Sequence, residues 1–159
     1  MAEPRRNTRV AKTAKTKPMD EYGHLQPQAP ELEEAVLGAL MIEKDAYSLV
    51  SEILRPESFY EHRHQLIYAA ITDLAIQQKP IDILTVAEQL RSRGNLEEAG
   101  GPFGITQLSS KVATSAHIEY HAQIVHEKYL RREMILGFNK LLACSLDETM
   151  DIDDSLVDA

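Results

Sequence analysis

Apolar residues recur at intervals of three or four positions over most of the chain from residue 30 onward. This spacing places side chains on one face of an α-helix, whereas a half-buried β-strand needs strict alternation of polar and apolar residues, which no segment shows. Proline suits the first turn of a helix, as at Pro30, because its missing N–H removes no helical hydrogen bond there. The first periodic segment, about 30–42, carries four such apolar residues: Leu32, Val36, Leu37 and Leu40. The pattern predicts an all-α protein.

Capping and breaking residues divide the remaining periodic region into further helices. Asp45 and Asp82 suit N-cap positions, because their side-chain oxygens can accept hydrogen bonds from free backbone N–H groups. Pro56 ends the helix after Asp45, since the residue before a proline is disfavoured in the helical region. Gly94 ends the helix after Asp82, because glycine tolerates the left-handed conformation of a C-cap. The expected helices are about 45–55, 61–78, 82–93, 102–111 and 115–146.

Apolar stripes indicate which sides of the later helices face a core. The helix after Asp82 and the one that follows it carry short stripes, namely Leu84, Ala87 and Leu90, then Phe103, Ile105 and Leu108. The longest helix is too long to pack along its whole length on the small group of helices before it. Part of its apolar stripe must therefore pack on a second helix or on another subunit. Its expected inner positions are Ile118, Ala122, Val125, Tyr129, Ile135, Phe138, Leu141 and Leu142.

These elements predict three parts in the chain. Residues 1–28 are basic and interrupted by prolines and a glycine, which is typical of a disordered tail. Residues 29–113 predict a globular head, a compact bundle of about five short helices. Residues 114–159 predict a long helix that begins a helical hairpin, whose second helix is truncated.

The composition fits one globular domain with tails, since 159 residues with 43% hydrophobic content can bury a single core. Cys144 is the one cysteine, which excludes an internal disulfide and favours a reducing, cytoplasmic location. No apolar run approaches the roughly 18 residues that span a bilayer, so we expect no membrane partner.

The net charge of −8 is unevenly distributed. Residues 1–20 hold six Lys or Arg and two Asp or Glu, a charge of +4, so the remainder carries −12. An acidic body repels a phosphate backbone, which disfavours direct binding of double-stranded DNA by the folded part. The basic tail leaves two interpretations open: a soluble disordered extension, and a nucleic-acid-binding module that acts through the tail.

The residues provide little support for catalysis. The glycine-rich run at 100–104 lacks the Gly-Lys-Ser/Thr ending with which a phosphate-binding loop holds a nucleotide. His117 and His121 lie four positions apart, with His126 nearby, and could hold zinc in a metal hydrolase. The acidic residue between them is one position late for the zincin motif, however, and a pair of exposed histidines needs no metal. We therefore expect no catalytic, cofactor-binding or metal-binding residues.

Several segments, in order and spacing, resemble the N-terminal domain of the bacterial DnaB-type replicative DNA helicases. The resemblance covers about residues 30–137, and its motifs are specific as an ordered set rather than singly. They are ELEEAVLGAL from Glu31, PESFY from Pro56, HQLIY from His64, PIDILTVAEQL from Pro80, Gly100-Gly101, YHAQIV from Tyr120 and KYLRREMI from Lys128.

The resemblance implies a helical head followed by a hairpin. It also implies that the domains pair, that the pairs form a collar above a hexameric ATPase ring around single-stranded DNA, and that the collar receives a DnaG-type primase. The expected partners are further copies of the chain as dimer and hexamer, primase, and a helicase loader, with single-stranded DNA bound only through the full-length ring. ATP and Mg belong to the ATPase motor, which is missing from this sequence, so we expect a non-catalytic assembly and docking domain.

Matching by position, the resemblance implies primase contacts at Ile135 and Leu141. A further contact falls at Gly104, where this sequence departs from its relatives, which carry an aromatic residue. Ile135 and Leu141 have an alternative role as ordinary hairpin core, because apolar residues at helical spacing usually pack within their own domain. The sequence does not assign the residues of an oligomer interface.

Overall fold

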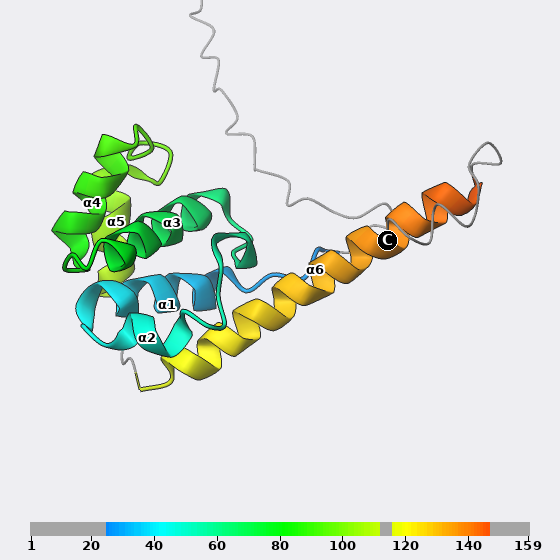
Figure 1. The fold of residues 1–159 in the computed structure, drawn as a ribbon, viewed down its shortest axis with the longest axis horizontal. Helices are drawn as coiled ribbons and strands as arrows, with labels where there is room; N and C mark the ends of the chain where they lie inside the picture. Colours follow the sequence, from blue (N-terminus) through cyan, green and yellow to red (C-terminus); the bar gives the residue numbers. More distant parts are fainter. Residues whose placement is uncertain (1–24, 112–115, 147–159) are drawn as a thin grey trace, which may run out of the picture.

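The computed structural model describes residues 25–111 and 116–146, and its regular elements within these ranges are all helices (Figure 1). This confirms the all-α fold class. The elements are α1 (Pro30–Ile42), α2 (Ala46–Val50), the 3-10 helix η1 (Pro56–Ser58), α3 (His62–Ile76), α4 (Ile83–Ser92), α5 (Gly101–Ser110) and α6 (Ile118–Leu146). The expected disordered tail and second hairpin helix fall mainly on residues 1–24 and 147–159, which lie outside the described residues.

Helix α1 is at the centre of the head and packs against α3, α5 and α6 (Figure 1). Helix α4 packs on α3 and α5, whereas α2 and η1 lie against α6. The first turns of α6 therefore close one side of the head, and the rest of α6 runs out of it as a single rod (Figure 1). None of the described helices is long and apolar enough to cross a membrane.

The core is built on the apolar stripe of α1, of which Val36, Leu37 and Leu40 are fully buried. Burying a side chain of this size stabilises the fold by about 1.5–3 kcal/mol. Phe59 and Tyr68 pack beside these residues with ring centroids 5.0 Å apart, and the Tyr68 hydroxyl donates to the Leu54 carbonyl at 3.2 Å. Ile118, Ala122 and Val125 of α6 complete the same core, as their periodicity predicts.

The capping predictions differ in outcome. Asp82 caps α4 as predicted: its Oδ1 accepts from the N–H groups of Leu84 and Thr85, both at 2.9 Å. Gly94 follows α4 with φ of +75°, as the C-cap prediction required. Asp45 occupies the N-cap position of α2 as predicted, but its side chain makes no hydrogen bond to the helix, so the expected capping bond is absent.

Three details of the predicted helices are corrected. The second helix is shorter than expected, because α2 ends at Val50 and the chain continues in turns toward Pro56. Leu84 is 81% exposed, since Val86 and Leu90 are the residues of α4 that face the core. Phe103 is 79% exposed, because Ile105 and Leu108 occupy the inner side of α5.

Candidate protein-docking interface

Burial divides α6 into two halves. Its first turns bury Ile118, Ala122 and Val125, but after Val125 no described residue of the helix is buried. The second half instead exposes large apolar side chains: Leu130, Met134, Leu136, Phe138, Leu142 and Leu146, each between 47% and 75% exposed. Exposed apolar side chains grouped in this way make the segment a candidate surface for contact with another protein element. We call residues 130–146 of α6 the exposed half.

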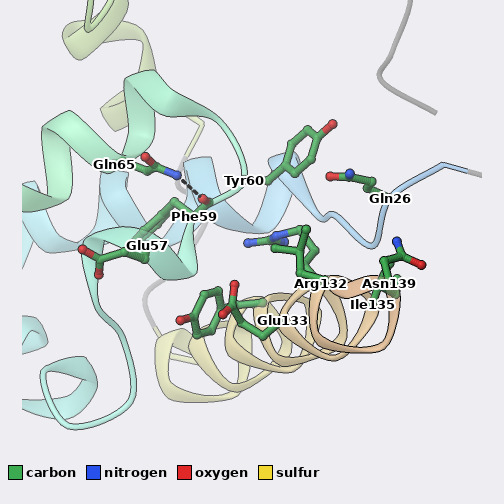
Figure 2. A pocket seen from close by; sticks show the side chains of 11 residues that line it. Gln26, Glu57, Phe59, Tyr60, Gln65, Arg132, Glu133, Ile135 and Asn139 are labelled. Carbon is green, nitrogen blue, oxygen red and sulfur yellow. Dashed lines mark hydrogen bonds between the residues drawn. The ribbon is translucent and has the colours of Figure 1, made fainter. Parts of the chain in front are cut away.

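A groove of about 620 Å³ lies where the exposed half leaves the head (Figure 2). Tyr60 of the head, next to the fully buried Phe59, forms one wall, and Ile135 and Leu136 of α6 form the other. Polar residues complete the lining: Gln26, Glu57, Gln65, Arg132, Glu133 and Asn139, together with Tyr129. Such a mixture of apolar walls and polar groups suits a protein segment better than a small apolar ligand.

A second, shallower hollow of about 440 Å³ lies on α6 itself. It is lined by Leu130, Glu133, Met134, Gly137, Phe138 and Leu141. A Cβ atom added at Gly137 would meet no described side chain or neighbouring element within 4 Å. The backbone of α6 is therefore open to an approaching element at that point. Small residues at a helix surface permit another helix to come close, and the hollow is therefore suited to helix packing.

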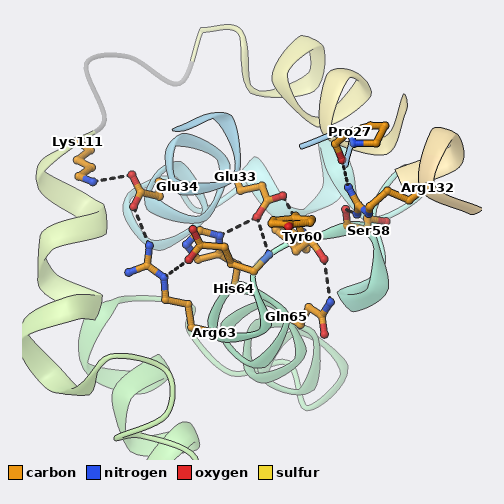
Figure 3. Close-up of polar contacts among 12 residues, drawn as sticks. Pro27, Glu33, Glu34, Ser58, Tyr60, Arg63, His64, Gln65, Lys111 and Arg132 are labelled. Atoms are coloured by element: carbon orange, nitrogen blue, oxygen red, sulfur yellow. Dashed lines mark hydrogen bonds and ion pairs between the residues drawn. The ribbon is translucent and has the colours of Figure 1, made fainter. Parts of the chain in front are cut away.

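Arg132 connects α6 with the head at the groove (Figure 3). Its Nη1 donates to the Pro27 carbonyl at 2.8 Å and its Nη2 to the Ser58 carbonyl at 2.9 Å. The guanidinium also lies 5.5 Å from the ring centroid of Tyr60 and 5.9 Å from that of Tyr129, within range of cation–π attraction. Partial burial lowers the pKa of Arg132, but arginine remains charged at any physiological pH.

A buried acid fixes the segment that carries Tyr60. Glu33 of α1 accepts from the Tyr60 N–H at 2.7 Å and lies 2.8 Å from Nδ1 of His64, and both side chains are fully buried (Figure 3). A weaker bond at 3.4 Å comes from the N–H of Glu61. The wall of the groove thus depends on a polar contact inside the head.

Glu34, the next residue of α1, joins α5 and α3 at the surface. Its carboxylate lies 2.6 Å from Nζ of Lys111 and 3.2 Å from Nη2 of Arg63 (Figure 3). Burial opposes the charged form, but the hydrogen bond to Lys111 and the two positive charges outweigh it, so the pKa of Glu34 is lowered from its ordinary 4.5. The ion pairs of Glu34 with Lys111 and Arg63 therefore stabilise the head at pH values above the ordinary pKa of 4.5.

The structure places the three predicted contact residues in different surroundings. Ile135 is half-buried and lines the groove, and Leu141 is half-buried and lines the second hollow. Gly104 lies on α5, which packs on α1 and α4, and it belongs to neither hollow. Ile135 and Leu141 therefore share the exposed half of α6, and Gly104 lies apart from them.

The sequence did not predict the roles of two residues, Glu33 and Arg132. Glu33 lies four positions before Leu37, which places this acid on the buried face of α1, and this spacing was the available signal. Arg132 gave no comparable signal, because its carbonyl partners belong to residues 105 and 74 positions away. As for the histidines considered as zinc ligands, within the described ranges no three His, Cys, Asp or Glu side chains group closely enough to hold a metal ion.

Comparison with known proteins identifies relatives of this chain. Residues 25–127 match the family described as the DnaB-like helicase N terminal domain. The chain is 47% identical over 129 residues to the replicative DNA helicase DnaB of Rhodothermus marinus, and 38% identical over 135 residues to the replicative DNA helicase DnaC of Bacillus subtilis (strain 168). These matches cover 81% and 85% of this chain but only 14% and 30% of the relatives.

Solved structures give the same result. The crystal structure of the N-terminal domain of DnaB helicase from Mycobacterium tuberculosis matches with a TM-score of 0.77 and 37% identity, over 82% of this chain and 95% of that one. The structure of a DnaB-like replicative helicase, described together with its interactions with primase, matches with a TM-score of 0.67. At 24% identity over 82% of this chain and 31% of that one, the second match establishes a common fold.

Proposed function

Because this chain belongs to the family of DnaB-like helicase N-terminal domains, we propose that it is the assembly and primase-docking domain of a replicative DNA helicase. In this role it holds copies of the helicase together in a collar and receives a DnaG-type primase, which keeps priming next to unwinding in the cytoplasm. The domain takes no part in ATP hydrolysis, and ATP with Mg is used by the motor of the full-length helicase. The single observation that carries the proposal is the exposed half of α6.

The exposed half is suited to two kinds of contact. Its apolar side chains can pack on a helix of another copy. Packing of this kind is the usual way in which a long helix buries apolar side chains that its own domain leaves exposed. The groove beside it offers apolar walls and a polar rim to a partner of different sequence. Self-assembly and primase docking can therefore use neighbouring parts of one surface.

Primase binding is tested by isothermal titration calorimetry of this chain, and of a longer form that continues beyond residue 159, against the C-terminal domain of the primase from the same cell. Binding by either form is the expected result. Ile135→Asp should weaken binding about tenfold, since a charge in an apolar contact costs about 1.4 kcal/mol or more. Ile76→Asp is the matched control, because Ile76 is 75% exposed at the end of α3, away from both hollows.

An absence of heat with both forms, at concentrations well above a micromolar dissociation constant, would reject this proposal. Unfolding of Ile135→Asp, judged by loss of the helical circular dichroism signal, would make Ile135 a core residue of the domain and reject only its role as a primase contact.

The charge of +4 on residues 1–20 supports a second candidate, a nucleic-acid-binding module. Binding to single-stranded DNA through this segment should fall steeply with salt, because each phosphate contact releases counterions. It should disappear when residues 1–20 are deleted. A fluorescent oligonucleotide whose anisotropy does not change at low salt would eliminate this candidate.

A further inference from the structure

The direction of the exposed half depends on the point where α6 leaves the head. The helix continues for 14 residues after Arg132, to Leu146, which is about 21 Å at 1.5 Å per residue. A tilt of about 10° at Arg132 would therefore move the far end of α6 by about 4 Å, following the same helical rise. Since packed interfaces tolerate shifts much smaller than this, the surface needs a fixed direction to be useful.

Packing of the core does not fix this direction by itself. The buried residues of α6 end at Val125, almost two helical turns before Arg132. Between these points the helix passes the open groove, and Tyr129 is only half-buried there. A separate contact near the groove is needed to hold the helix against the head.

Arg132 has the geometry for such a contact. Its two terminal nitrogens bind the carbonyls of Pro27, in the segment before α1, and of Ser58, in η1 of the head. The rings of Tyr60, from the head, and Tyr129, from α6, lie within 6 Å of the same guanidinium. A planar fork held at both nitrogens and beside two rings resists rotation as well as separation.

We propose that Arg132 is the positioning residue that sets the direction of the exposed half of α6 relative to the head. The consequence for docking rests on the proposed function, whereas the geometric role does not. Lysine cannot replace arginine here, because a single ammonium does not reach two carbonyls in a fork and does not stack on rings in the same way. The buried core residues of α6 are untouched by substitutions at this site, so the head should stay folded.

The test measures the direction of α6 without any partner. Cys144 is the one cysteine and lies near the far end of α6, so the single substitution Gln107→Cys, at an exposed position of α5, completes a pair of labelling sites. Pulsed electron spin resonance then gives the distribution of distances between the two nitroxides. Dilution with unlabelled protein removes distances between copies.

The labelled protein should give one narrow distribution, and both Arg132→Gln and Arg132→Lys should widen it at least twofold. Arg131→Gln is the matched control and should leave the width unchanged, because Arg131 is exposed and its guanidinium binds Glu127 within α6 itself. Thermal melting followed by circular dichroism should give folded protein for Arg132→Lys, which keeps the charge and the aliphatic stem. Should Arg132→Gln fail to fold, the width for Arg132→Lys decides the test.

The proposal would be overturned if a folded Arg132→Gln protein gave a distance distribution as narrow as that of the parent. It would also be overturned if the distribution for Arg132→Lys were as narrow as that of the parent. Failure of primase binding has no bearing on these distances. If the widths increase while the parent chain binds no primase, the positioning role of Arg132 stands and the docking function is the part that is rejected.

Discussion

Glu33 shows how one buried acid organises the contact between α1 and the start of α3. It is 1% exposed, and its carboxylate meets the N–H of Tyr60 at 2.7 Å and Nδ1 of His64 at 2.8 Å. A buried polar group costs little while it is paired, but its removal leaves its partners unpaired in a medium of low dielectric constant. The stability of the head should therefore be sensitive to this residue.

We predict that Glu33→Ala lowers the free energy of unfolding by about 3 kcal/mol, because the Tyr60 N–H and the His64 ring lose their partner. Urea denaturation followed by circular dichroism measures this value. Glu31→Ala is the control, since Glu31 is exposed in the same helical turn and should change stability by less than about 0.5 kcal/mol. A loss for Glu33→Ala as small as that of the control would show that the pair contributes nothing.

The neighbouring Glu34 leads to a prediction about pH. Its pKa is lower in the folded head than the ordinary 4.5, because Lys111 and Arg63 outweigh the effect of burial. A carboxyl group with a depressed folded-state pKa stabilises the fold above its unfolded-state pKa, and this contribution is lost as pH falls through the folded-state value. Glu34→Gln should thus be less stable than the parent at pH 7, and the difference should shrink as pH falls below the ordinary pKa of 4.5 and vanish once pH lies below the lowered folded-state pKa. Urea denaturation of both proteins across this pH range measures the difference.

At the scale of elements, the two aspartates before α2 and α4 look alike in sequence but differ in their bonds. Asp82 Oδ1 accepts two backbone N–H groups at 2.9 Å, and Thr85 Oγ1 accepts from the Asp82 N–H at 2.9 Å. Asp45 makes no side-chain hydrogen bond to α2. The same residue type therefore has different energetic weight in the two positions.

Asp82→Ala should lower the free energy of unfolding by about 1 kcal/mol, the usual cost of removing a helix cap. Asp45→Ala should have almost no effect, because the bond from Ser48 Oγ goes to the backbone carbonyl of Asp45, which the substitution keeps. Thermal and urea denaturation of the two variants side by side provide the comparison. Equal losses in both would contradict the assignment of the cap to Asp82 alone.

Two glycines, Gly137 and Gly94, should respond in opposite ways to alanine. Gly137 lies inside α6 with open space where the methyl group of alanine would lie, so Gly137→Ala should stabilise the helix by about 0.5–1 kcal/mol. Gly94 also has free space, but its φ of +75° is unfavourable for alanine, so Gly94→Ala should destabilise by about 1 kcal/mol. Melting temperatures that shift in the same direction would count against this account.

At the scale of the whole molecule, α6 begins against the head, and its exposed half projects away from it (Figure 1). The first turns of the helix are part of the core, whereas Met134 and Phe138 are 58% and 62% exposed. A chain with a large apolar surface on a projecting rod should associate when its concentration rises. The acidic charge of the body opposes association only weakly at physiological salt, because screening acts over about 8 Å.

We therefore predict that Phe138→Asp reduces self-association, measured as a fall in average mass by light scattering after size-exclusion chromatography across a range of protein concentrations. Phe103→Asp is the matched control, since Phe103 is 79% exposed on α5 and belongs to neither hollow. A shift of about tenfold in the association constant corresponds to about 1.4 kcal/mol, a modest value for a central apolar contact. The prediction fails if both aspartate variants associate as the parent does.

The sequence by itself determined where the chain is helical and where several helices stop. The α1 boundaries, the cap at Asp82 and the left-handed turn at Gly94 all agree with expectation. These features depend on interactions within about one helical turn, and residue type and spacing describe such interactions well. The inner positions Ile118, Ala122 and Val125 of α6 were predictable for the same reason.

Only the tertiary structure decided which of several similar residues meets the core and what the charged ones bind. Leu84 and Val86 have comparable hydrophobicity, yet one is 81% exposed and the other fully buried, because the position of α3 selects one side of α4. The Glu33 carboxylate contacts the His64 ring, 31 positions along the chain, and Arg132 donates to the Pro27 carbonyl, 105 positions away. Contacts between residues so far apart depend on how whole helices pack, and the order of residues along one helix does not contain that information.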